Sequence, residues 1–71
     1  MTDITALNTF IKNSGMTITA IAEKAAIGRP TLYNKLDGKS EFTASEIVSL
    51  ANVLHMTPEQ RNAIFLSEKS N

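Results

Sequence analysis

The chain has 71 residues, of which 42% are hydrophobic, 20% charged and 6% aromatic, so it has room for one small domain with a single thin core and excludes a two-domain enzyme. It contains no cysteine, and His55 has no second ligand type at metal-binding spacing, which excludes disulfides and a zinc site as sources of stability. Seven Lys and Arg balance seven Asp and Glu, so no global field attracts a polyanion.

The first two helices are predicted from apolar residues that recur three and four positions apart. The first is expected over about residues 3–13, with Thr2 or Asp3 as its N-cap. The second is expected over about residues 18–25, and Thr17 can cap it. Their apolar faces consist of Ile4, Leu7, Phe10 and Ile11 in the first helix and Ile18, Ile21, Ala22 and Ala25 in the second.

The third helix is expected over about residues 29–36. Pro30 suits its first turn, where the missing N–H costs little, and Gly38 suits its end. The last two helices begin at a shared signal, a threonine followed three residues later by Glu or Gln. One follows Thr43 and ends near His55.

The fifth helix is expected over about residues 58–66, and a polar tail, residues 67–71, follows it. These elements predict an all-α fold, a compact five-helix domain over residues 1–66. Its predicted core consists of Leu7, Phe10, Ile11, Ile21, Ala22, Ile27, Leu32, Leu36, Ile47, Leu50, Ala51, Leu54 and one or both of Ile64 and Phe65.

The second and third helices, joined by Ala26-Ile27-Gly28, have the spacing of a helix-turn-helix. Residues 21–39, with the sequence IAEKAAIGRPTLYNKLDGK, resemble the Cro and repressor type (XRE-like) of helix-turn-helix domain. The resemblance continues through the later helices and covers nearly the whole chain. Within this family the chain is most similar to the antirepressors of lactococcal temperate phages.

The resemblance implies that the third helix lies in the DNA major groove, with its N-terminal side chains at base edges and flanking polar residues on phosphates. An arginine at this place can donate two hydrogen bonds to guanine, worth about 1–3 kcal/mol of discrimination. Carried over by position, the base-facing candidates are Arg29, Pro30 and Tyr33, with Thr31 and Asn34 at the margin. The phosphate candidates are Thr17, Lys35 and Lys39.

The chain departs from the family pattern at three positions that affect DNA reading. Ile18 stands where the family commonly has a phosphate-binding Gln, and Pro30 removes a donor at the tip of the third helix. Ala26 stands where a positive φ usually requires glycine, at a cost of about 1 kcal/mol, so the turn can shift toward Gly28. Direct base readout is therefore expected to be poor.

The charge on the helix-turn-helix is small. Residues 24–39 carry Lys24, Arg29, Lys35 and Lys39 against Asp37, a net charge of +3 on a neutral chain. Four cations support a weaker electrostatic contribution than the 6–10 phosphate contacts of a strong DNA binder. The same basic face can instead dock on a protein.

The C-terminal run Ile64-Phe65-Leu66 predicts a second surface. Consecutive helical residues are rotated by about 100°, so the three cannot all face one core, and at least one is expected to point outward. Exposed apolar area of this kind favours self-association or a partner, although packing against the first helix is an equal alternative. Tyr33 has the same two interpretations, an interface contact or a cover for the edge of the core.

Two classes of regulator fit these features. In one, the chain is an antirepressor that binds the DNA-binding domain of its cognate phage repressor and favours lytic growth. In the other, a Cro-like homodimer reads a palindromic operator through Arg29, Tyr33 and Asn34. Joint binding of DNA with the repressor remains a third alternative.

Other classes of function have little support in the sequence. No nucleophile motif, phosphate-binding glycine loop or paired carboxylates predict an enzyme, and no cofactor or metal is expected. No apolar run has bilayer length, and the N-terminus lacks a signal-peptide pattern, so we expect a protein of the bacterial host cytoplasm without a membrane partner.

Overall fold

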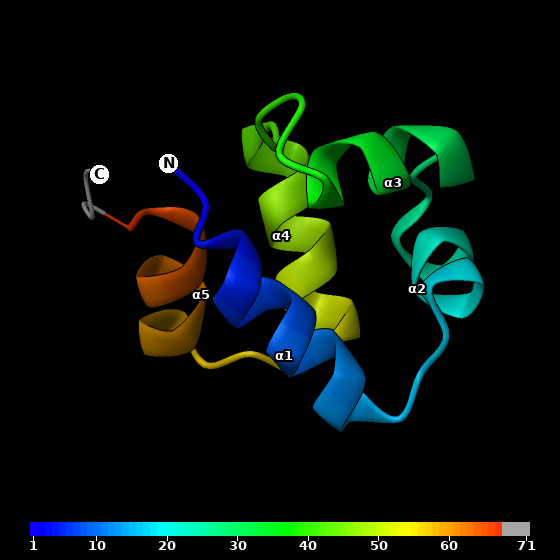
Figure 1. Ribbon diagram of the computed structural model, residues 1–71. Helices are drawn as coiled ribbons and strands as arrows, with labels where there is room; N and C mark the ends of the chain where they lie inside the picture. Colours follow the sequence, from blue (N-terminus) through cyan, green and yellow to red (C-terminus); the bar gives the residue numbers. More distant parts are fainter. Residues whose placement is uncertain (68–71) are drawn as a thin grey trace.

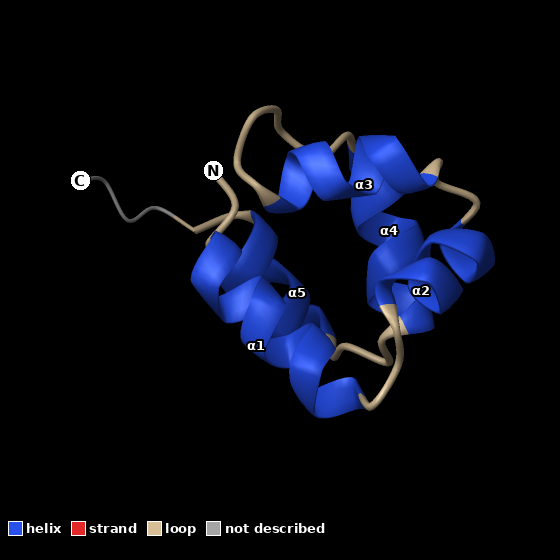
Figure 2. Cartoon of the chain, turned by 45° about the vertical axis from the view of Figure 1, so that its right-hand side comes forward, coloured by secondary structure: helices blue, strands red, loops and turns tan. Residues whose placement is uncertain are grey.

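Five helices make up the computed structural model, which describes residues 1–67 and has no strand in that range (Figures 1 and 2). They are α1 (Ile4–Ser14), α2 (Ile18–Ala25), α3 (Arg29–Leu36), α4 (Ala44–Val53) and α5 (Pro58–Phe65). The predicted all-α fold is confirmed, and α2 and α3 coincide with their predicted ranges. Apart from Ser67, the predicted polar tail lies outside the described residues.

The helices are arranged in two groups around α4. In Figure 1, α5 lies to the left of α4 and α2 and α3 lie to its right, while α1 runs below α4. α1 packs against α5 and α3, whereas α2 packs against α3 and α4. The amino-terminal end is fixed to the last helix, because the backbone N–H of Asp3 donates to the carbonyl of Ile64 at 2.7 Å.

Side-chain caps explain why the helices begin where they do. The carboxylate of Asp3 accepts from the N–H of Ala6 at 3.0 Å, so Asp3 rather than Thr2 caps α1. Thr17 caps α2 in the same way. Complete capping boxes start α4 at Thr43 and α5 at Thr57. Such bonds satisfy backbone donors that the first turn of a helix leaves unpaired.

The end of α2 corrects one prediction. Ala26 has a φ of 58°, in the left-handed region, so the turn does not shift toward Gly28, whose φ is −58°. The N–H groups of Ile27 and Ala26 donate to the carbonyls of Ala22 and Glu23, which is the Schellman pattern. These two bonds hold Ala26 in a conformation that an alanine otherwise avoids. Gly38 occupies the equivalent place after α3, at a φ of 80°.

All five helices contribute to one core. The largest fully buried side chains are Leu7, Ile21, Leu32, Leu50 and Phe65, one from each helix. Most of the predicted core is confirmed, including both Ile64 and Phe65, but Phe10 and Ile47 are only partly buried. The prediction missed Ala25 and Phe42. Phe42 meets the ring of Phe65 edge to face at 5.4 Å, and this contact joins the segment before α4 to the end of α5.

The left-handed positions after α2 and α3 predict opposite changes in stability for two exchanges between alanine and glycine. We expect Ala26→Gly to raise the free energy of unfolding by about 1 kcal/mol, because glycine adopts a positive φ without strain. Gly38→Ala should lower it by about the same amount. No side chain lies within 4 Å of the Cβ position at Gly38, so only backbone strain contributes there. Urea denaturation measures both, and a loss of stability in Ala26→Gly would contradict the assignment.

Candidate functional site

The helix-turn-helix is held together by small and branched apolar side chains. Ala22 and Ile27 are buried between α2 and α3, and Leu32 and Leu36 form the inward row of α3. With this row facing the core, the rotation of about 100° per residue turns other positions outward. The outward positions of α3 and the residue after it are Arg29, Pro30, Tyr33, Asn34 and Asp37, all of which are exposed.

Arg29 is the first residue of α3, and its guanidinium extends toward α2. Its Nη1 lies 3.5 Å from Oγ1 of Thr19, at the outer limit of a hydrogen bond. This contact restrains the arginine loosely and leaves most of its donors open. Thr19 was not among the predicted site residues, because its role depends on the crossing of two helices and gives no signal in the sequence.

Thr17 and Ile18 occupy the start of α2. The Oγ1 of Thr17 accepts from the N–H of Ala20 at 3.0 Å, so this exposed hydroxyl caps the helix and keeps its own proton for an outside acceptor. Ile18 is partly buried against the core. The position at which the family commonly supplies a polar side chain is therefore occupied here by a packing residue.

Lys35 stands apart from the other predicted contacts. Its side chain is only 11% exposed, and its ammonium group bonds to the carboxylate of Glu46 at 2.5 Å. The family resemblance predicts a phosphate contact for Lys35 by its position. In the structure its ammonium group is already paired, and the partner lies eleven residues away on α4.

Glu46 belongs to the same polar cluster. Burial of its carboxyl would raise the pKa, but hydrogen bonds from Lys35 and from the backbone N–H of Thr43, with the nearby ammonium charge, outweigh burial and lower the pKa below its usual value of 4.5. The Oε1 atom that bonds Lys35 also accepts from the N–H of Thr43 at 2.8 Å. The carboxylate therefore links α3 to the first turn of α4.

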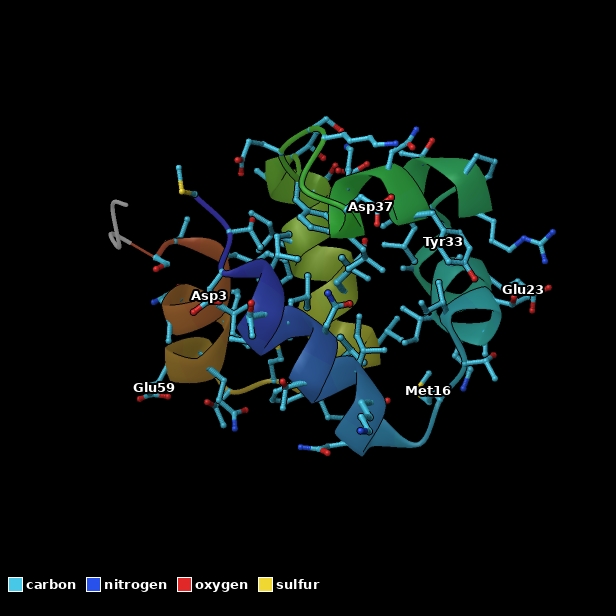
Figure 3. All side chains as sticks on the ribbon, in the orientation of Figure 1. Asp3, Met16, Glu23, Tyr33, Asp37 and Glu59 are labelled. Carbon is cyan, nitrogen blue, oxygen red and sulfur yellow. The ribbon has the colours of Figure 1, made fainter. Side chains whose placement is uncertain are left out.

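The remaining charges leave the helix-turn-helix weakly basic. Lys24, Arg29 and Lys39 are exposed, and so are Glu23 and Asp37. Figure 3 places Glu23, Tyr33 and Asp37 along the α2 and α3 side of the molecule. Tyr33 is 47% exposed, so it does not simply cover the edge of the core. With Lys35 paired, fewer cations are available for phosphates than the sequence predicts.

An open groove lies between α3 and α4. Its volume is about 450 Å³. Thr31 lines it from α3, and Ser45 and Ser49 line it from α4. Ala25 at the end of α2, the turn before α3, the capping residue Thr43 and Glu46 complete its lining. The groove is therefore open between the end of α2, the start of α3 and the first half of α4.

The apolar run at the end of α5 divides between core and surface. Ile64 and Phe65 are 6% and 2% exposed and both pack in the core, as the core prediction allowed. Leu66 is 59% exposed. The expectation that at least one member of the run points outward is confirmed, and the interface hypothesis now rests on Leu66.

Comparison with known proteins identifies the chain as a helix-turn-helix DNA-binding domain. A family model for the Cro/C1-type helix-turn-helix DNA-binding domain matches residues 6–60, which is most of the chain. No curated protein and no solved structure matched the chain.

Within residues 1–67, every helix is too short or too polar to traverse a lipid bilayer. No three His, Cys, Asp or Glu side chains in that range are placed to hold a metal ion.

The pKa of Glu46 predicts how stability depends on pH. Since folding lowers this pKa, the ion pair stabilises the native state above about pH 4.5 and loses this effect as the pH falls through the folded-state pKa. We expect Glu46→Gln to lower the free energy of unfolding by about 1–2 kcal/mol at pH 7. The difference from the wild type should shrink below pH 4.5 in urea titrations. A difference that stays constant down to pH 3 would refute the pairing.

The division of the apolar run predicts different effects for neighbouring substitutions. Phe65→Ser should lower the free energy of unfolding by at least about 3 kcal/mol, because it removes a buried ring. Leu66→Ser should change it by no more than about 0.5 kcal/mol. Thermal denaturation measures the stability, and size-exclusion chromatography shows whether Leu66→Ser alters assembly. Equal losses of stability in the two variants would argue against the assigned burial.

Proposed function

We propose, since the chain belongs to the Cro/C1-type helix-turn-helix DNA-binding domain family, that it regulates transcription as an antirepressor. In this role it binds the DNA-binding domain of a cognate phage repressor and stops that repressor from holding its operator. In a temperate phage the result is a shift toward lytic growth. The partner surface is the exposed side of α2 and α3, including Arg29, Pro30, Tyr33 and Asn34.

The observation that carries this proposal is the weak positive charge of the helix-turn-helix. DNA affinity depends strongly on the number of phosphates that Lys and Arg neutralise. Lys35 is bound to Glu46, which leaves Lys24, Arg29 and Lys39 as exposed cations on this part of the chain. Each additional acid on the same side, such as Glu23, opposes a phosphate backbone.

The uncharged residues of α3 suit a protein partner better than a duplex. Tyr33 offers a half-exposed aromatic ring, a residue type enriched at protein interfaces and their energetic centres. Pro30 and Asn34 flank it without charge. A repressor's DNA-binding surface is basic, and Glu23 and Asp37 offset part of the repulsion that the exposed cations of this face would meet there. This combination supports contact with the surface that the repressor uses for DNA.

A Cro-like homodimer that binds an operator is the second candidate. The observation in its favour is Arg29, which stands exposed at the first position of α3, where family members place base-reading side chains. Lys39 and the hydroxyl of Thr17 would then hold phosphates. Joint binding of DNA with the repressor uses the same residues. The salt dependence of binding separates these modes.

Mobility-shift titrations on the phage switch region test the proposal. We expect this protein alone to give no shift or a weak one at physiological salt, the repressor alone to shift its operator, and added antirepressor to abolish that shift. Arg29→Ala should weaken the effect about tenfold or more, whereas Lys12→Ala, an exposed cation of α1, should not. A tight shift by the protein alone, with a steep loss of affinity as salt rises, would overturn the antirepressor proposal in favour of Cro-like binding.

A further inference from the structure

The recognition helix α3 has few attachments for an element that must present its side chains accurately. It has only eight residues, and its packing partners are α1 and α2. Leu32 and Leu36 are its buried apolar residues, four positions apart in one row. Its N-cap, Gly28, makes no side-chain hydrogen bond, unlike the caps of the other four helices. A single apolar row resists withdrawal from the core but opposes rotation about the helix axis only weakly.

The ion pair between Lys35 and Glu46 supplies a contact beside that row. Lys35 lies three residues after Leu32 and one before Leu36, so its side chain leaves the helix on one side of the row, about 60° from Leu32 and about 100° from Leu36. This side faces α4, where Glu46 receives the ammonium group at 2.5 Å. An off-axis contact of this kind opposes rotation of the helix.

Glu46 is a fixed anchor rather than a mobile surface acid. Its side chain is 17% exposed. The Oε1 atom is held by the N–H of Thr43, and the N–H of Glu46 in turn bonds to Oγ1 of Thr43 at 3.2 Å. The first turn of α4 therefore holds the carboxylate in place independently of Lys35.

The groove between α3 and α4 makes this link important. Thr31 lines the groove from α3 and Ser45 and Ser49 line it from α4, so side-chain packing leaves this part of the boundary open. Farther along α3, the ion pair of Lys35 with Glu46 joins α3 to α4. Movement of α3 toward or away from α4 is thus limited mainly at one end.

We infer that the Lys35–Glu46 ion pair positions α3, so that the directions of Arg29 and Tyr33 depend on a charge pair that itself contacts no ligand. Lys35 and Glu46 are therefore positioning residues. The inference rests on the proposed function only for the identity of the partner that α3 binds.

The chain provides a conservative way to remove the charge. Gln60 completes the capping box of α5 with its Oε1 at 2.9 Å from the N–H of Thr57, so Glu46→Gln can keep the cap of α4 while it removes the anion. Lys35→Met keeps the aliphatic length and removes the cation. Glu59→Gln and Lys12→Met are matched controls, because they delete the same charges at exposed positions on α5 and α1.

Amide hydrogen exchange of the free, full-length protein under folding conditions tests the inference. In Lys35→Met and Glu46→Gln we expect the amides of residues 32–36 to lose protection by on the order of tenfold more than those of α1 and α5, whose exchange follows the loss of global stability. The control variants should match the wild type throughout. Unchanged protection of α3, or an equal loss of protection in all helices, would overturn the inference and leave the pair with a contribution to global stability alone.

Binding is then measured at a temperature where every variant is fully folded. Affinity for the repressor domain, or for operator DNA, should fall about fivefold or more in both variants and not in the controls. Unchanged affinity would also overturn the inference. If the wild type binds neither ligand, the proposed function fails, and the exchange result still decides the role of the pair.

Discussion

The shared core is the constraint on which every other feature depends. Helices of eight to eleven residues are not stable alone in water, and each one here contributes one fully buried side chain to the same interior. With 71 residues, no cysteine and no second layer, the chain has little redundancy in this packing. The exposed face of α3 is consequently only as well defined as the contacts of Leu32 and Leu36 and the polar link to α4.

Features that arise within a few residues could be predicted from the sequence. Threonine caps placed the starts of α2, α4 and α5, because a side-chain oxygen bonds an N–H three residues ahead. The turn after α2 was harder, since Schellman bonds to Ala22 and Glu23 override the local preference of Ala26. The conformational preference of a single residue does not show whether hydrogen bonds will outweigh its backbone strain.

Features that join distant parts of the chain could not be predicted. No residue near Lys35 in the sequence indicates a pairing with an acid eleven residues away, so the sequence predicts only a phosphate contact for it. Phe42 was missing from the predicted core, because its packing on Phe65 arises only when the chain folds. The exposed residues of the candidate site could be identified because the inward row of α3 fixes the outward one. The ligand that these residues bind depends on the surface of the partner molecule, which local sequence patterns do not reveal.

The hydrogen bond from Asp3 to Ile64 also fixes where the amino-terminal end of the domain lies. It places the start of the chain beside the end of α5, whereas α2 lies on the opposite side of the molecule (Figure 1). Met1 and Thr2 also line a pocket with Gly38, Ser40 and Glu41, so the start of the chain lies near the loop that follows α3. A fluorescent label attached at Met1 therefore sits beside α5 and that loop, and it leaves α2 unobstructed.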